Sequence, residues 1–379
     1  MGGAPLVRIV DASLGSDAQV KLVVSRVSKP DKLRSAWSSS GATIEQVADR
    51  IHATTTVEAL ARAAGRSLER DEAKTLDRCL RQSVTAWGGG VPQVTARGRA
   101  LPTNKRPLIM GIVNITPDSF SDGGALYPEG HPGTAIDHAR ALVAAGADVV
   151  DVGGESTRPG AEEIAADEEL TRTMAVIRAL VSDGVCVSID TRKPDVALAA
   201  LKEGAAIVND VSGAANSDVI VHAAKNGAAY VLMHVKGTPA DMVQHCTYDD
   251  VVAEVFEFLV DGLQRCEDLG LSRDQVVVDP GIGFAKTAEQ SLALLRAVRQ
   301  FRCLGRPVLI GASRKSFLSV AAGIEGVDNR LPGSLAAAAL AAADGAAFLR
   351  VHDVAQTVQA VRTARSIATG QSDWTPISG

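Results

Sequence analysis

From Lys105 onward, short apolar runs of strand length alternate with stretches of helical periodicity. The expected strands span residues 108–113, 147–152, 185–189, 206–208, 228–233, 275–278, 307–310 and 346–351. The expected helices span residues 134–145, 168–182, 194–203, 217–226, 249–269, 288–301, 332–344 and 354–367. These repeated β-then-α units, joined by short returns, predict a closed parallel (β/α)8 TIM barrel of the α/β class. An open doubly wound sheet is the alternative.

Glycine ends several of the expected helices. Gly146, Gly204, Gly227 and Gly345 each precede an alanine and the next expected strand. Glycine tolerates the left-handed backbone conformation that stops a helix. The pattern therefore predicts abrupt returns from helix to strand.

Residues 1–103 lack the alternation and carry more Lys and Arg than Asp and Glu. We expect strands at 6–10 and 20–24, helices at 43–51, 56–64 and 71–83, and linker segments at 88–90 and 97–107. Trp37 and Trp87 are expected to serve core or hinge packing. The predicted organisation is a small N-terminal α+β domain of unknown role plus linker over 1–103, the barrel over 104–370, and a tail over 371–379.

Composition narrows the functional class. The chain has 379 residues, five cysteines and a net charge of -5. The cysteines show no CxxC motif and no cysteine–histidine spacing, which indicates free thiols in a reducing cytoplasm. No apolar run reaches the roughly 18 residues of a spanning helix, and no secretory signal opens the chain, so no membrane partner is expected. The acidic balance argues against a nucleic-acid partner.

Polar residues stand at the C-terminal end of each expected strand. They are Asn114, Asp151, Glu155 to Arg158, Asp190, Asn209, Asp210, His234, Asp279, Ser313 to Lys315, Arg350 and His352. In a barrel these ends meet at one rim. Any one of them could be a turn residue or a helix cap, but Lys, Arg and His do not cap helix N-termini, so the set indicates a site.

Two kinds of chemistry are represented at this rim. The oxygen and amide groups of Asp190, Asn209 and Asp279 suit a planar, nitrogen-rich heterocycle. Positive charge for a phosphate or pyrophosphate would come from Lys315, Arg158, Arg314, Arg350 and His352. Asn114 and Asp122 could supply oxygen ligands for Mg2+. The chain offers no Ser–His–Asp arrangement and no GxGxxG fingerprint.

Eight motifs along the barrel resemble those of the dihydropteroate synthase family of the folate pathway. They are MGIVNITPDSFSDGG (110–124), GGESTRPGA (153–161), SIDT (188–191), VNDVSG (208–213), MHVKGTP (233–239), DPGIGFAK (279–286), GASRKSF (311–317) and RVHDV (350–354). The resemblance covers residues 105–370 in order. It implies a transferase that condenses 6-hydroxymethyl-7,8-dihydropterin pyrophosphate with p-aminobenzoate to give 7,8-dihydropteroate and pyrophosphate.

The resemblance also implies roles for individual residues. Pterin and pyrophosphate contacts would come from Thr157, Arg158, Asp190, Asn209, Met233, Asp279, Lys315, Arg350 and His352. Of these, Lys315, Asp190, Arg350 and His352 form the implied catalytic set, and Asn114 would bind Mg2+. The p-aminobenzoate pocket, which sulfonamide drugs mimic, would comprise Phe120, Pro159, Phe284, Arg314 and Ser316. A homodimer through the late barrel helices is implied as well.

Two other functions stay open. A pterin-binding methyltransferase would share the acidic pterin contacts, but it would not need the anion-handling motifs around Arg158, Lys315 and Arg350. A catalytically silent paralogue would be expected to lack Lys315, Arg350 or Asn114, and all three are present. A bifunctional enzyme is disfavoured because the N-terminal region lacks the acidic and histidine clusters of a pathway kinase or aldolase.

Overall fold

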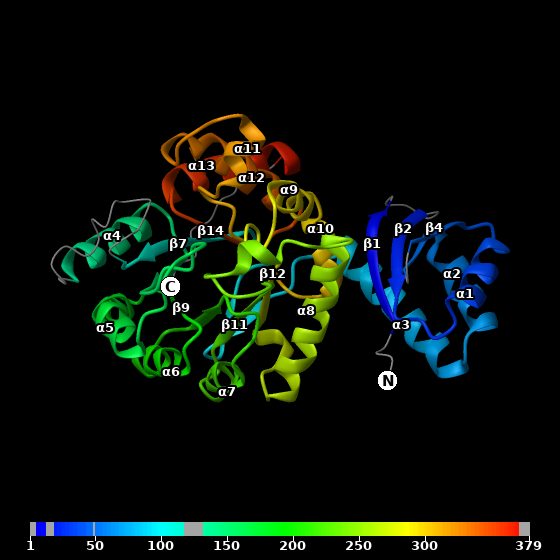
Figure 1. Ribbon diagram of the computed structural model, residues 1–379, viewed down its shortest axis with the longest axis horizontal. Coiled ribbons are helices and arrows are strands. Elements are labelled where there is room, and N and C mark those ends of the chain that lie inside the picture. Colours follow the sequence, from blue (N-terminus) through cyan, green and yellow to red (C-terminus); the bar gives the residue numbers. More distant parts are fainter. Residues whose placement is uncertain (1–4, 13–18, 48–49, 117–131, 371–379) are drawn as a thin grey trace. The chain divides into compact units, whose positions relative to one another are not determined.

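The computed structural model describes residues 5–12, 19–47, 50–116 and 132–370 (Figure 1). The chain divides into two compact units, one of Met1–Val91 with Arg299–Gly305 and one of Pro92–Val298 with Arg306–Gly379. The second unit therefore includes a short hairpin, β5 (Val94–Ala96) with β6 (Arg99–Leu101), and β6 falls within the linker predicted over 97–107.

The first unit contains an antiparallel sheet and three helices. The sheet has the order β1-β2-β4-β3 and consists of β1 (Leu6–Ala12), β2 (Gln19–Ser25), β3 (Thr43–Val47) and β4 (Arg50–Thr56). The helices are α1 (Pro30–Ser38), α2 (Val57–Ser67) and α3 (Arg70–Gly88). The predicted helix over 43–51 is wrong, because this stretch pairs as β3 and β4. Its β-branched residues favour a strand, and pairing with β2 satisfies the backbone of β4.

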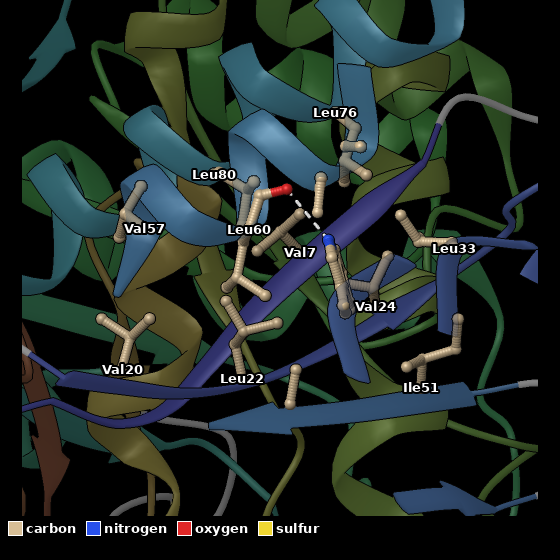
Figure 2. Close-up of a cluster of buried hydrophobic side chains, with 14 of the residues drawn as sticks. Val7, Val20, Leu22, Val24, Leu33, Ile51, Val57, Leu60, Leu76 and Leu80 are labelled. Atoms are coloured by element: carbon tan, nitrogen blue, oxygen red, sulfur yellow. Dashed lines mark hydrogen bonds between the residues drawn. The ribbon is translucent and has the colours of Figure 1, made fainter. Parts of the chain in front are cut away.

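Figure 2 shows the apolar core of this unit. Leu33, Leu60, Leu76 and Leu80 come from the three helices and are fully buried. They belong to one cluster with strand residues Val7, Val20, Leu22, Val24 and Ile51. The fully buried Trp37 belongs to it too and donates its indole N–H to the carbonyl of Leu60 at 2.9 Å, which confirms its predicted packing role.

A short segment between two barrel elements belongs to the first unit. It runs through α10 (Val298–Phe301) and η4 (Arg302–Leu304). The Cys303 thiol donates to the carbonyl of Ser83 at 3.8 Å, and the Arg299 guanidinium lies 5.1 Å from the centroid of the Trp87 ring. The helix predicted over 288–301 is accordingly divided into α9 (Ala288–Arg296) and α10.

The second unit is the predicted TIM barrel. Its parallel strands are β7 (Leu108–Asn114), β8 (Val149–Gly153), β9 (Val187–Asp190), β10 (Ile207–Asp210), β11 (Ala229–Met233), β12 (Val276–Asp279), β13 (Leu309–Ile310) and β14 (Phe348–Val351). They pair in the order β12-β11-β10-β9-β8-β7-β14-β13. An isolated parallel bridge between Val278 and Val308 joins the two end strands, and the Val278 N–H donates to the Pro307 carbonyl at 2.9 Å. The sheet therefore closes, and the open-sheet alternative is wrong.

Helices surround the strands (Figure 1). They are α4 (Gly133–Ala144), α5 (Ala166–Ser182), α6 (Pro194–Glu203), α7 (Ser217–Lys225), η2 (Met242–His245), α8 (Val251–Asp268), η3 (Arg273–Gln275), α9, α11 (Phe317–Ala322), η5 (Asp328–Arg330), α12 (Leu331–Ala343) and α13 (Val354–Thr369). The predicted helix-ending glycines Gly146, Gly204, Gly227 and Gly345 have φ of 104°, 112°, 64° and 89°, which confirms their role. Within the described ranges, no helix is long and apolar enough to cross a membrane.

A buried ion pair joins the chain before β7 to the chain before β8. Two nitrogens of Arg106 donate to the two carboxylate oxygens of Asp148, both at 2.7 Å. Asp148 also accepts the backbone N–H of Ile109 at 2.8 Å. Both side chains are less than a tenth exposed, at 7% and 9%.

Removing Arg106 leaves the Asp148 carboxylate buried beside an apolar strand. We expect Arg106→Ala to lower the free energy of unfolding by about 3–5 kcal/mol, measured by urea denaturation. The matched control is Arg140→Ala, which breaks an ion pair with Asp183 whose arginine is 52% exposed, and it should change stability little. Equal losses in the two variants would contradict this account.

Candidate active site

Strand register aligns four residues at the rim of the barrel. Asn114 of β7 pairs with Gly153 of β8, Gly153 with Asp190 of β9, and Asp190 with Asn209 of β10. Side chains at matching positions of adjacent parallel strands point the same way. The Asn114 amide, the Asp190 carboxylate and the Asn209 amide therefore lie in one row at the rim. Gly153 leaves a space between the first two.

Arg350 of β14 connects two carboxylates of this rim. Its Nε donates to Asp151 Oδ2 and its Nη2 donates to Asp190 Oδ2, both at 2.6 Å. Asp151 also accepts the Asn209 amide N–H at 3.0 Å. Burial opposes charge on the guanidinium, but Asp151 and Asp190 outweigh it and raise the pKa of Arg350 above its usual value.

Asp190 lies in a dry position. Burial raises the pKa of its carboxyl to about 7, although the attraction of Arg350 acts in the opposite direction and the nearby charge of Asp151 adds to the rise. Burial and the ion pair with Arg350 therefore act on the charge of this carboxyl in opposite directions.

Asp279 and Lys315 form a second charged group. Asp279 ends β12, and one of its oxygens accepts the Gly281 N–H at 2.7 Å. Burial raises the pKa of Asp279 and lowers the pKa of Lys315 to about 8, and each charge partly offsets the other's burial. The Lys315 ammonium donates to the Ile282 carbonyl and lies 4.5 Å from the centroid of the Phe284 ring. The loop after β12 thus forms one wall of the lysine site.

His352 follows β14 and lies within the electrostatic influence of four cationic side chains. Burial, together with the charges of Arg350, Arg314, Arg158 and Lys315, lowers the pKa of its imidazole to about 3. This shift favours the neutral imidazole near pH 7, and the positive charge expected of His352 from the sequence stays a prediction. The ring shares a hydrogen bond with the Ser313 hydroxyl at 3.1 Å.

The remaining predicted residues occupy different surroundings. Arg314 donates from Nε to Asp353 at 2.9 Å, so its guanidinium is held by the loop after β14. Met233 is buried at the end of β11, in register with Asp279. Thr157 and Arg158 are half-buried, whereas Pro159 and Ser316 are exposed. Phe120 and Asp122 lie outside the described residues.

The rim offers limited but suitable donors for a magnesium ion. A Cβ placed on Gly153 would lie 3.6 Å from Asp190 Oδ2 and 3.7 Å from Asn114 Oδ1, so the glycine leaves room between two oxygens. Over the described part of the chain, no group of three or more His, Cys, Asp or Glu side chains could hold a metal. Asn114 therefore fits an ion that takes most of its ligands from phosphate and water.

Sequence reasoning missed three contributors to this site. It noted Asp151 and His234 as polar strand ends and gave them no role, and it did not single out Lys286. The buried Lys286 ammonium lies 3.0 Å from His234 Nδ1 and donates to the Phe284 carbonyl at 2.8 Å, so it fastens the loop after β12 to the end of β11. Burial lowers the pKa of Lys286 to about 7. These residues are distinguished by their burial. That burial comes from residues distant in the sequence, so it could not be predicted from the sequence.

Comparison with known proteins identifies the arrangement. Residues 110–352, which contain every rim residue named above, match the model of a family described as pterin binding enzyme. A dihydropteroate synthase of Escherichia coli is 42% identical over 270 residues, covering 70% of this chain and 93% of that protein.

Solved structures agree with the family match. The chain resembles the Yersinia pestis dihydropteroate synthase in a sulfonamide complex with a TM-score of 0.69 and 37% identity, covering 73% of this chain and 98% of that one. It also resembles the structure of the Xanthomonas albilineans dihydropteroate synthase with 4-aminobenzoic acid. The TM-score is 0.67 and the identity 41%, and the match covers 74% of this chain and 99% of that one. The chain therefore belongs to the pterin-binding enzyme family that includes the dihydropteroate synthases.

Proposed function

We propose that the protein is a dihydropteroate synthase, which joins the pterin-methyl group of 6-hydroxymethyl-7,8-dihydropterin pyrophosphate to p-aminobenzoate and releases pyrophosphate. The observation that carries the proposal is the pairing of cations with acids at one barrel mouth. Arg350 bridges Asp151 and Asp190, and the charges of Lys315 and Asp279 attract each other. Acids and an amide suit the ring, whereas the cations suit the leaving group.

Asp279, Asn209 and Asp190 would hold the pterin ring. Their buried oxygens accept N–H groups, and such contacts favour a ligand rich in N–H groups over one without them. Asp279 already has one oxygen committed to the Gly281 N–H, which fixes the carboxylate plane. Met233, buried beside Asp279, would pack against the ring face.

Arg350 and Lys315 would act on the pyrophosphate, with Arg158, Thr157 and His352 nearby. When the C–O bond breaks, the electron pair leaves with pyrophosphate and a pterin-methyl cation forms. The guanidinium and ammonium stabilise the departing negative charge in a buried setting, where electrostatic effects are larger than in water. The aryl amine attacks the cationic carbon and then loses a proton. No strong base is required, since an aryl amine is unprotonated near pH 7.

The second substrate would bind at the outer side of Lys315. Phe284 and Arg314 flank the lysine, and Pro159, Ser316 and Phe120 complete the proposed p-aminobenzoate pocket, where a sulfonamide would compete. Arg314 suits the benzoate carboxylate because its guanidinium is preoriented by Asp353. The structure of the Xanthomonas albilineans relative with 4-aminobenzoic acid supports p-aminobenzoate as the second substrate.

Asn114 and Asp122 would hold Mg2+. The ion would supply positive charge to the pyrophosphate oxygens, which lowers the free energy of the leaving group. The amide oxygen of Asn114 beside the gap at Gly153 supports this part of the proposal. We also place the protein in the cytoplasm, since all five cysteines are free thiols.

The function is tested by an assay with the two organic substrates and Mg2+. We expect pyrophosphate and 7,8-dihydropteroate in equal amounts, no turnover when p-aminobenzoate is left out, and loss of turnover on EDTA treatment that Mg2+ restores. Asn114→Ala should raise the Mg2+ concentration for half-maximal rate by about tenfold, because it removes an oxygen ligand. Pterin binding without product in the wild type would identify a silent paralogue and contradict the proposal.

The half-buried Lys315 should set a limit on activity at alkaline pH. Its pKa is lowered to about 8, so the ammonium is charged below that pH and neutral above it. We expect kcat/KM for the pterin substrate to fall by about tenfold per pH unit above about pH 8. Lys315→Arg, whose guanidinium stays charged, should lose this alkaline limb. An unchanged limb in Lys315→Arg would show that another group is responsible.

We propose that the protein forms a homodimer through α12 and α13. These two helices pack together and line a shallow apolar groove that includes Leu335, Ala360, Ala364 and Ile367. Leu340 of α12 is 69% exposed and Ile367 of α13 is 80% exposed, although both are large apolar side chains. Covering such a surface by a second copy would remove it from water.

Light scattering after size-exclusion chromatography tests the dimer. We expect the wild type to have twice the mass of one chain and Leu340→Glu to shift toward the monomer, because a charge would be buried in the contact. The matched control is Val243→Glu, since Val243 is 63% exposed and lies in η2. A wild-type monomer, or equal behaviour of the two variants, would rule out this interface.

A further inference from the structure

Asp151 holds two groups of the pterin site at once. It lies in β8, is fully buried, and contacts residues of two other strands. A single oxygen, Oδ2, accepts both the Arg350 Nε at 2.6 Å and the Asn209 Nδ2 at 3.0 Å. Its other oxygen, Oδ1, has no hydrogen-bond partner among the residues that the structure describes.

The contact with Asp151 determines how Asn209 presents its amide. A carboxylate oxygen accepts hydrogen bonds and cannot donate, so the amide nitrogen of Asn209 has to face Asp151. The amide oxygen then lies on the other side of the group, where it is an acceptor for an N–H of a bound ring. Asn209 is only 2% exposed, and reversing its amide would bring two oxygens together in a dry site.

Asp151 also determines the orientation of Arg350. The guanidinium is planar, and hydrogen bonds from Nε to Asp151 and from Nη2 to Asp190 fix that plane at two points. With Asp190 alone, the group could rotate about a single contact. Two of its five N–H donors are used in this way, which leaves the others for an anion.

We propose that Asp151 is a positioning residue that sets the orientation of Asn209 toward the pterin ring and of Arg350 toward the pyrophosphate, without touching either substrate. The inference rests on the proposed function. Its structural basis is the shared oxygen of Asp151, which couples ring recognition to anion recognition. Loss of this oxygen should therefore weaken use of the pterin substrate and spare p-aminobenzoate.

The experiment compares three substitutions with the wild type in steady-state kinetics and thermal unfolding. Asp151→Ala and Asp151→Leu remove the acceptor, and the leucine fills the space that alanine leaves empty. Asp151→Asn keeps one oxygen for both donors and places its nitrogen where Oδ1 has no described partner. The matched control is Asp148→Ala, because Asp148 is also a buried carboxylate, next to the start of β8, but pairs with Arg106 instead of with Asn209 or Arg350.

We expect Asp151→Ala and Asp151→Leu to raise KM for dihydropterin pyrophosphate by about 10- to 100-fold, with KM for p-aminobenzoate changed by less than about threefold. Asp151→Asn should restore the pterin KM to within about threefold of the wild type. Asp148→Ala should lower Tm and leave both KM values near those of the wild type. If the acceptor-free variants do not fold, the pterin KM of Asp151→Asn is compared with the wild type alone. A value within about threefold supports the inference, and a larger increase contradicts it.

Two results would overturn the inference. One is an unchanged pterin KM in a folded acceptor-free variant, and the other is an Asp151→Asn variant as impaired as Asp151→Ala. Failure of the proposed function is a separate outcome, since it would appear in the wild type as absence of p-aminobenzoate-dependent pyrophosphate release.

Discussion

The burial of charge at the mouth of the barrel is the constraint on which the site depends. A carboxylate in a dry position costs several kcal/mol unless a cation or N–H group compensates it. Asp151 and Asp190 are compensated by Arg350, and Asp279 by Lys315 and the Gly281 N–H. Each group holds its neighbour in place, so the cations are oriented before substrate arrives. Such preorganisation allows a buried site to stabilise a departing pyrophosphate without rearranging.

The fold brings these groups together through strand register. Asn114, Gly153, Asp190 and Asn209 come from four successive strands, and the parallel pairing aligns them at one level. Arg350 arrives from β14, which pairs with β7 on the other side of Asn114. Arg350 therefore meets Asp151 and Asp190, which lie 199 and 160 positions earlier in the chain, because β14, β7, β8 and β9 are consecutive strands of the sheet. The glycine at position 153 keeps space open between two of the oxygen-bearing side chains.

The alternation of apolar runs and helical stretches was sufficient to predict all eight barrel strands, because burial on both faces leaves a clear pattern. The pattern failed at residues 43–51, where β3 pairs with β4 and β4 pairs with β2, because the partner strands that stabilise this stretch are not visible in its own sequence. The polar or charged residues at the strand ends could be predicted as site residues from the sequence. They are Asp190, Asn209, Asp279, Lys315 and Arg350. The lowered pKa of His352 and the contacts of Asp151 could not be predicted from the sequence. Both depend on side chains that are distant in the sequence but close in the fold.

The central claim is that Asp279 and Asn209 hydrogen-bond the pterin ring while Lys315 and Arg350 bind its pyrophosphate, all at the same barrel mouth. A crystal structure of the protein with 7,8-dihydropteroate and pyrophosphate tests it most directly. The account predicts ring nitrogens within about 3 Å of Asp279 and Asn209 and pyrophosphate oxygens at the same distance from Lys315 or Arg350. A ring bound away from the two side chains, or a pyrophosphate bound outside the barrel mouth, would contradict it.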